Sequence, residues 1–180
     1  MVTKRKKKLP APTWPDEIFT TLKDADIAQV SYVPDAGHTT LIDACLADNR
    51  IKTTRLTTEE EGIGLSLGAW LGGERSVLLM QSSGVGNCIN MLSIIEETRS
   101  PLLMLVTMRG EWGEFNPWQI PMGQGTQKVL EDAGVIVYHV DDADDLAETT
   151  YAASQIAFNS FRAVAVLIGQ RVIGFKDWRK

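Results

Sequence analysis

The chain has 180 residues, of which 44% are hydrophobic and 23% are charged, and a formal net charge of −5. This length fits one domain whose core needs no disulfide or metal, and the acidic balance argues against general nucleic-acid binding. The longest apolar runs fall far short of the roughly 20 residues that a membrane-spanning helix needs. We therefore expect neither nucleic acid nor a membrane as a partner.

The first 14 residues form a basic, proline-rich tail, with a run of cations from Lys4 to Lys8. Such a run is typical of a solvated segment, and membrane or nucleic-acid contact is the less favoured alternative. Pro15 suits the first turn of a helix. We expect a single domain over residues 15–180 that begins with this helix. Cys45 and Cys88 both lie in apolar helical patterns. This favours buried, reduced thiols and a cytoplasmic location.

Apolar strands and helical patterns alternate along the rest of the chain. We expect strands over residues 27–33, 51–57, 76–81, 102–107, 135–140 and 163–168, and helices over residues 15–26, 39–47, 58–73, 85–98, 126–133 and 144–161. Such alternation predicts an α/β fold in which helices cover both faces of a parallel sheet of about six strands, that is, a three-layer sandwich. The long aromatic loop over residues 108–124 is typical of a lid or an interface.

The segment from Thr57 to Gly73 contains the most informative helix. Thr58 and the following Glu59, Glu60 and Glu61 form a helix N-terminal signal, because acceptors and negative charge suit the first turn. Five glycines follow, and each interior glycine costs a helix about 1 kcal/mol relative to alanine. Close approach of another backbone or a ligand would explain them. The three glutamates either cap the helix or place one carboxylate against a ligand.

Polar residues follow the predicted strands at the edge where α/β domains gather their chemistry. They are Asp35 and His38 after the first strand, Gln81, Ser82, Ser83 and Gly84 after the third, and Arg109 after the fourth. His139 lies within an apolar strand and is more typical of a structural histidine.

Several familiar sites are disfavoured by the same sequence. Gly84-Val-Gly86 opens a helix but lacks the third glycine of a dinucleotide fingerprint. The chain has no phosphate-binding loop, no Cys-x-x-Cys and no His-x-x-x-His, and it lacks the Gly-x-Ser-x-Gly elbow of a hydrolase. We expect no metal site within this chain.

Four runs together resemble the thiamine-diphosphate-dependent decarboxylases, and within them the α subunit of sulfopyruvate decarboxylase and the matching half of phosphonopyruvate decarboxylase. They are Val33-Pro-Asp35, Thr58-Glu-Glu-Glu-Gly-Ile-Gly64, Met80-Gln-Ser-Ser-Gly-Val-Gly-Asn87, and Arg109-Gly-Glu111 with Pro121-Met-Gly123. The resemblance implies a pyrimidine-binding domain over residues 15–180. It also implies an α subunit that converts 3-sulfopyruvate to sulfoacetaldehyde and CO2. A phosphonopyruvate or other 2-oxo acid decarboxylase subunit and a non-catalytic ligand-binding subunit are the alternatives.

The resemblance also implies roles for individual residues. Glu60 would be the catalytic group, bound to N1′ of the cofactor's aminopyrimidine, with Glu59 and Glu61 as capping or surface residues. Glu60, Gln81, Ser82, Ser83 and Gly84 would bind the cofactor. Asp35, His38, Gln81 and Arg109 would bind the substrate, since a guanidinium matches an oxyanion.

The chain has no Gly-Asp-Gly segment, which in these enzymes holds Mg²⁺ and the diphosphate. The resemblance therefore implies a β subunit that supplies the diphosphate-binding domain and the metal, with the cofactor between two chains and self-association into at least α2β2.

Overall fold

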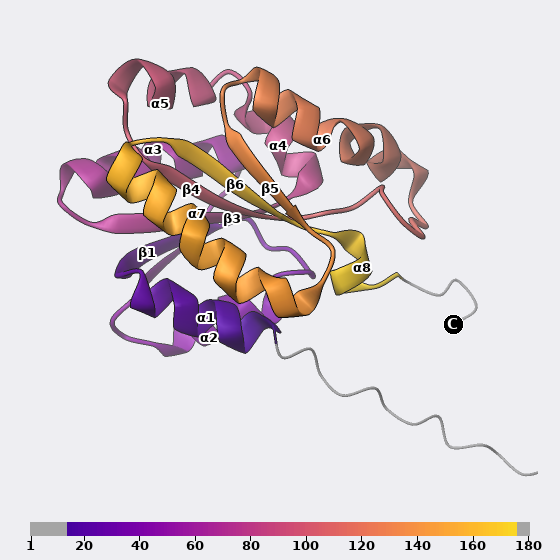
Figure 1. The fold of residues 1–180 in the computed structure, drawn as a ribbon, viewed down its shortest axis with the longest axis horizontal. Coiled ribbons are helices and arrows are strands. Elements are labelled where there is room, and N and C mark those ends of the chain that lie inside the picture. The colour runs from indigo at the N-terminus through magenta and orange to yellow at the C-terminus, as the bar shows by residue number, and fades with distance from the viewer. Residues whose placement is uncertain (1–13, 176–180) are drawn as a thin grey trace, which may run out of the picture.

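The structure is a computed structural model that describes residues 14–175 and shows a six-stranded sheet between two layers of helices (Figure 1). All strand pairs are parallel, and the strand order is β2-β1-β3-β4-β6-β5. The strands are β1 (Ile27–Tyr32), β2 (Lys52–Arg55), β3 (Arg75–Gln81), β4 (Leu102–Thr107), β5 (Ile136–Val140) and β6 (Ala163–Ile168). The predicted α/β three-layer fold is confirmed.

One face of the sheet is covered by α1 (Trp14–Asp24), α2 (Thr39–Ala47) and α7 (Leu146–Ser160). The other face is covered by α3 (Glu59–Leu71), α4 (Ser82–Cys88), α5 (Leu92–Thr98) and α6 (Ile120–Asp132). Because side chains alternate along a strand, the central strands supply apolar residues to both layers, for example Leu79 to the first and Leu78 to the second. This two-sided burial explains why β4 is apolar at five of its six positions.

Each layer contains one of the two cysteines. Cys45 of α2 is buried in the first layer and Cys88 of α4 in the second, and both are free thiols. Burial raises the pKa of each thiol to about 12; nearby Asp48 adds to the shift at Cys45, and Glu59 and Glu60 add to it at Cys88. The expectation of reduced, buried cysteines is confirmed.

Two helices differ from the sequence prediction. The helix expected over residues 85–98 begins at Ser82 and is divided into α4 and α5 at Ile89–Met91. Gly84 and Gly86 weaken the helical propensity of this segment, which helps to explain why α4 is short. The helix expected over residues 126–133 begins six residues earlier, at Ile120. Its start is prepared by the 3₁₀ turn η1 (Pro117–Gln119), where the Asn116 side chain accepts a hydrogen bond from the Trp118 N–H, and by Pro121 in the first turn.

Shorter elements complete the chain, namely the 3₁₀ turn η2 (Ala143–Asp145) and the short helix α8 (Gln170–Ile173), which the sequence did not predict. The predicted tail lies outside the described residues except for Trp14, which opens α1 and is 3% exposed. Among residues 14–175, no helix is both long enough and apolar enough to span a membrane.

Candidate active site

The carboxyl ends of β1, β3 and β4 bring three of the predicted site residues into one hydrogen-bonded network. Asp35 accepts from Gln81 Nε2 at 3.0 Å, from the Thr107 hydroxyl and from the Gly37 N–H. Gln81 Oε1 accepts from the Ser83 hydroxyl at 2.8 Å. Asp35, Gln81 and Ser83 therefore act as one unit whose side chains are fixed relative to one another.

The three glutamates of α3 have different surroundings. Glu61 is exposed, so it is a surface residue as expected, and its carboxylate accepts from the N–H of Thr57, the residue before the N-cap, at 2.9 Å. Glu60 is half-buried and accepts from the Thr58 hydroxyl at 3.1 Å. Thr58 occupies the N-cap position, but its hydroxyl makes no capping bond to the backbone.

Glu59 is the buried member of the three, with 8% of its surface exposed. Its carboxylate accepts from Asn87 Nδ2 at 2.8 Å and lies directly against Gly84, where a Cβ atom would overlap it. The expectation that Glu59 is a capping or surface residue is wrong. Glycine at position 84 is what allows the carboxylate of one helix to approach the backbone at the start of the next.

His38 and Ser82 are both buried beneath this edge of the sheet. His38 is 1% exposed, and its Nε2 donates to the Leu105 carbonyl at 3.1 Å. Burial lowers its pKa, so the imidazole is neutral near pH 7. The Ser82 hydroxyl accepts from the Arg109 N–H at 3.0 Å. Both side chains form hydrogen bonds to the backbone of a different segment. That His38 and Ser82 contact a ligand stays a prediction, and their burial does not favour it.

Arg109 is held by a residue that the sequence did not single out, Glu114. The pair is bidentate, with Arg109 Nε 2.7 Å from Glu114 Oε2 and Arg109 Nη2 2.6 Å from Glu114 Oε1. Glu114 also accepts from the N–H groups of Gly110 and Asn116 and from Gln170 Nε2. Burial alone would raise the pKa of Glu114, but Arg109 and these backbone donors lower it to about 2. The sequence signal for this ion pair was an arginine followed five residues later by a glutamate in the same loop.

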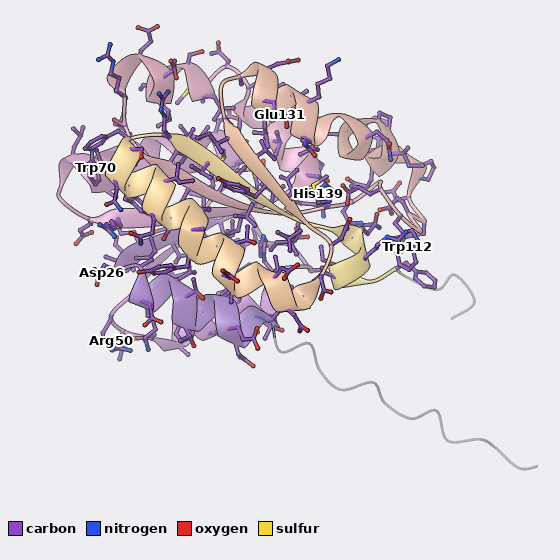
Figure 2. All side chains as sticks on the ribbon, in the orientation of Figure 1. Asp26, Arg50, Trp70, Trp112, Glu131 and His139 are labelled. Carbon is purple, nitrogen blue, oxygen red and sulfur yellow. The ribbon has the colours of Figure 1, made fainter. Side chains whose placement is uncertain are left out.

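The loop after β4 is anchored at its base by Gln170 and His139. Gln170 Oε1 accepts from the N–H groups of Glu111 and Trp112. His139 of β5 forms an ion pair with Glu111 at 3.3 Å, and the hydrogen bond to Glu111 raises its pKa. His139 is therefore structural, as expected. Figure 2 shows Trp112 at the end of the molecule beside α8, opposite Trp70 at the far end of the domain.

A cavity of about 210 Å³ lies at this edge of the sheet. Its lining includes Asp35, Gly37, Thr107, Arg109, Phe115 and Gln170. Three larger cavities carry none of the predicted site residues. Two of them, of about 570 and 680 Å³, lie around α5, α6 and the loop that follows α7, and the third, of about 270 Å³, lies between Lys23 and Arg50. The smaller cavity is the one that collects polar residues at the strand ends, where α/β domains commonly bind ligands.

Residues 34–174 match the family model described as "Pyruvate flavodoxin/ferredoxin oxidoreductase, thiamine diP-bdg", and the chain belongs to this thiamine-diphosphate-binding family. The chain is 34% identical over 154 residues to the sulfopyruvate decarboxylase subunit alpha of Methanococcus maripaludis, covering 85% of this chain and 92% of that protein. It is 32% identical over 151 residues to the subunit of the same name from Methanocaldococcus jannaschii, covering 83% and 89% of the two chains. These relatives confirm the resemblance to thiamine-diphosphate-dependent decarboxylases.

Two longer proteins match with part of their length. The phosphonopyruvate decarboxylase of Streptomyces viridochromogenes is 30% identical over 139 residues, covering 76% of this chain and 35% of that protein. The solved structure of the 2-oxoglutarate:ferredoxin oxidoreductase from Magnetococcus marinus superposes with a TM-score of 0.70 at 17% identity, covering 90% of this chain and 29% of that chain. The latter supports the fold alone.

The described residues fit one half of thiamine diphosphate and not the other. Glu59 offers a buried carboxylate at the start of α4, and a carboxylate is a group that can accept a hydrogen bond from a ring nitrogen or its proton. The diphosphate needs a metal, and among residues 14–175 no three His, Cys, Asp or Glu side chains are placed to hold one. The sequence also lacks Gly-Asp-Gly. The chemistry of these residues therefore fits the pyrimidine half of the cofactor better than its diphosphate.

Proposed function

We propose that this chain is the α subunit of a two-subunit thiamine-diphosphate-dependent decarboxylase that acts on sulfopyruvate. The single observation that carries the proposal is the buried Glu59 carboxylate against Gly84. It stands in a chain that is 34% identical to a sulfopyruvate decarboxylase subunit alpha over 92% of that subunit. Phosphonopyruvate or another 2-oxo acid remains the alternative substrate.

When bound, thiamine diphosphate supplies the carbanion chemistry that removes CO2 from a 2-oxo acid, while the protein orients the cofactor and tunes its protonation. The sequence predicted Glu60 for the tuning role, and nothing in the structure tests that role directly. Its geometry favours Glu59, because Glu59 is buried against the start of α4, whereas Glu60 is half-buried and accepts from the Thr58 hydroxyl beside it. Asn87 fixes the orientation of the Glu59 carboxylate by donating to Oε2.

A β subunit would complete the site by holding the diphosphate and Mg²⁺. The exposed face of α3 is the surface we assign to the subunit contact, since a Cβ at Gly64 or Gly68 would meet no atom within 4 Å. Leu65 and Leu71 on the same helix are 40% and 78% exposed. Small residues beside exposed leucines suit close helix packing. We propose an assembly of at least α2β2, located in the cytoplasm, where both thiols would stay reduced.

The substrate would occupy the cavity beside Asp35, Gln81 and Arg109. The network of Asp35, Gln81 and Ser83 provides fixed polar groups for the 2-oxo acid, and Arg109 provides a cation for its sulfonate. Arg109 is suited to this because its planar guanidinium matches an oxyanion.

The test is to co-express the chain with a partner that carries Gly-Asp-Gly and a downstream asparagine, and to screen 2-oxo acids with thiamine diphosphate and Mg²⁺. We expect release of CO2 from sulfopyruvate in preference to phosphonopyruvate and pyruvate. A complex that forms and binds the cofactor but decarboxylates none of the three would support a non-catalytic subunit instead.

A further inference from the structure

The ion pair between Arg109 and Glu114 uses only one edge of the guanidinium. Glu114 binds Nε and Nη2, which form the side-on edge. Two of the five N–H groups of an arginine are thereby satisfied, which leaves three, and they include both donors of Nη1. Among residues 14–175, no protein acceptor binds Nη1. The edge formed by Nη1 and Nη2 thus remains available for a second bidentate contact.

The surroundings hold the guanidinium in place. The Arg109 side chain is 18% exposed and that of Glu114 is 3% exposed. The guanidinium carbon also lies 5.3 Å from the centre of the Phe115 ring, at cation–π distance. Gln170, which is 3% exposed, donates to Glu114 Oε2 at 3.0 Å and so connects the pair to the end of β6. An arginine held by an ion pair and a cation–π contact loses little side-chain entropy when it binds a ligand.

Arg109 is the only cation among the described residues that line the 210 Å³ cavity. The other charged group in that lining is Asp35, whose carboxylate is already bound by Gln81, Thr107 and Gly37. Arg109 is therefore the one cationic group of this lining to which an oxyanion in the cavity would bind.

We propose that Glu114 is a positioning residue that aims the open edge of Arg109 at the sulfonate or other oxyanion at the far end of the substrate, and so sets substrate specificity. The proposal rests on the proposed function for the identity of the substrate. The anion site itself depends only on Arg109, Glu114 and the cavity. Glu114 would not touch the substrate, and its effect would be transmitted through the guanidinium.

The experiment titrates the full-length chain with 3-sulfopropionate, which carries the sulfonate but no ketone, and with butyrate, in which a methyl group replaces the sulfonate. We expect the wild-type chain to prefer 3-sulfopropionate by at least about tenfold, as for a charge-assisted bidentate contact. Arg109→Gln should abolish this preference, and Arg109→Lys should lose most of it although the charge stays. Glu114→Gln should also lose most of it.

The matched control is Glu111→Gln, because Glu111 lies in the same loop and binds Gln170 and His139 but makes no bond to Arg109. It should keep the preference, whereas a loop that merely needs its carboxylates for stability would lose it. If Glu114→Gln does not fold, Glu114→Asp, which withdraws the carboxylate by one methylene, takes its place.

Three results would overturn the proposal. They are no sulfonate preference in the wild-type chain, an unchanged preference in Arg109→Gln, and an intact preference in the Glu114 variant that folds. In the assembled enzyme, Glu114→Gln should raise KM for sulfopyruvate more than it lowers kcat, and should leave pyruvate kinetics nearly unchanged. An intact sulfonate preference in a complex that decarboxylates nothing would reject the proposed function and leave the anion site standing.

Discussion

The carboxylate of Glu59 lies against the backbone of Gly84, so close that a side chain at position 84 would overlap it. One residue opens α3 and the other lies in the first turn of α4, 25 positions later. The contact joins two of the four runs that carry the resemblance to thiamine-diphosphate enzymes. It also gives a structural basis for distinguishing three consecutive glutamates.

The first prediction compares two of those glutamates. Glu59→Gln keeps the shape of the side chain but removes the proton-sharing carboxyl, so exchange of the cofactor's C2 proton should slow by about 10²- to 10⁴-fold in the assembled enzyme. Glu60→Gln should exchange at nearly the wild-type rate. The measurement is proton–deuterium exchange at C2 by NMR. The opposite result would restore Glu60 to the role that the sequence predicted.

A second prediction concerns the glycine that accommodates Glu59. Gly84→Ala should displace the carboxylate, and a shift of about 1 Å in a catalytic group can cost about 10²-fold in rate. Gly86→Ala is the control, because a Cβ there would lie 3.6 Å from Met122 Sδ, an ordinary contact. The measurement is the decarboxylation rate of each variant, with circular dichroism to check that both fold. Equal rates would show that the Glu59 position is not critical.

The third prediction separates the two sides of α3. Gly62 faces Leu56 and Leu78 of its own domain, so Gly62→Leu should destabilise the isolated chain by about 1–3 kcal/mol or more through overpacking. Gly68 faces open space, and Gly68→Leu should fold normally but weaken assembly with the partner. Thermal unfolding and size-exclusion chromatography measure the two effects. Normal assembly of Gly68→Leu would place the subunit contact elsewhere.

A fourth prediction concerns the chain without a partner. It should bind thiamine diphosphate weakly and show no decarboxylase activity, because it offers a site for the pyrimidine half of the cofactor only. Calorimetry with and without Mg²⁺ tests this. Tight binding that depends on magnesium would contradict the two-subunit proposal.

The fifth prediction is a pH dependence at the base of the aromatic loop. Glu111 raises the pKa of His139 above its ordinary value of about 6.5, so their ion pair stabilises the fold fully below that pH. The contribution, about 1 kcal/mol or less for a partly exposed pair, is lost as pH rises through the raised pKa. The difference in stability between wild type and His139→Gln should therefore shrink between pH 6 and 9. If the stability difference between wild type and His139→Gln stayed constant across this pH range, the ion pair would not be the cause of that difference.

The sequence predicted the fold well because alternating strands and helices impose a parallel sheet with two covered faces. It placed Asp35, Gln81 and Ser83 at one edge for the same reason. It missed the buried position of Glu59, since three successive glutamates look alike until the helix is oriented against Gly84. It missed Glu114 because loop geometry, which brings this residue back to Arg109, has no periodic signature. Only part of the glycine argument holds, since Gly62 packs inside the domain and Gly64 and Gly68 do not.

The two buried cysteines provide a way to follow motion in this domain. Cys45 lies on one side of the sheet and Cys88 on the other, and each must become exposed before a thiol reagent can react with it. Their labelling rates would therefore report the local opening of the two helical layers separately. Cys88 belongs to α4, the helix that carries Gly84 and Asn87 against Glu59. If binding of the partner or cofactor slowed labelling of Cys88 more than labelling of Cys45, the helical layer that contains α4 would be the one that binding rigidifies.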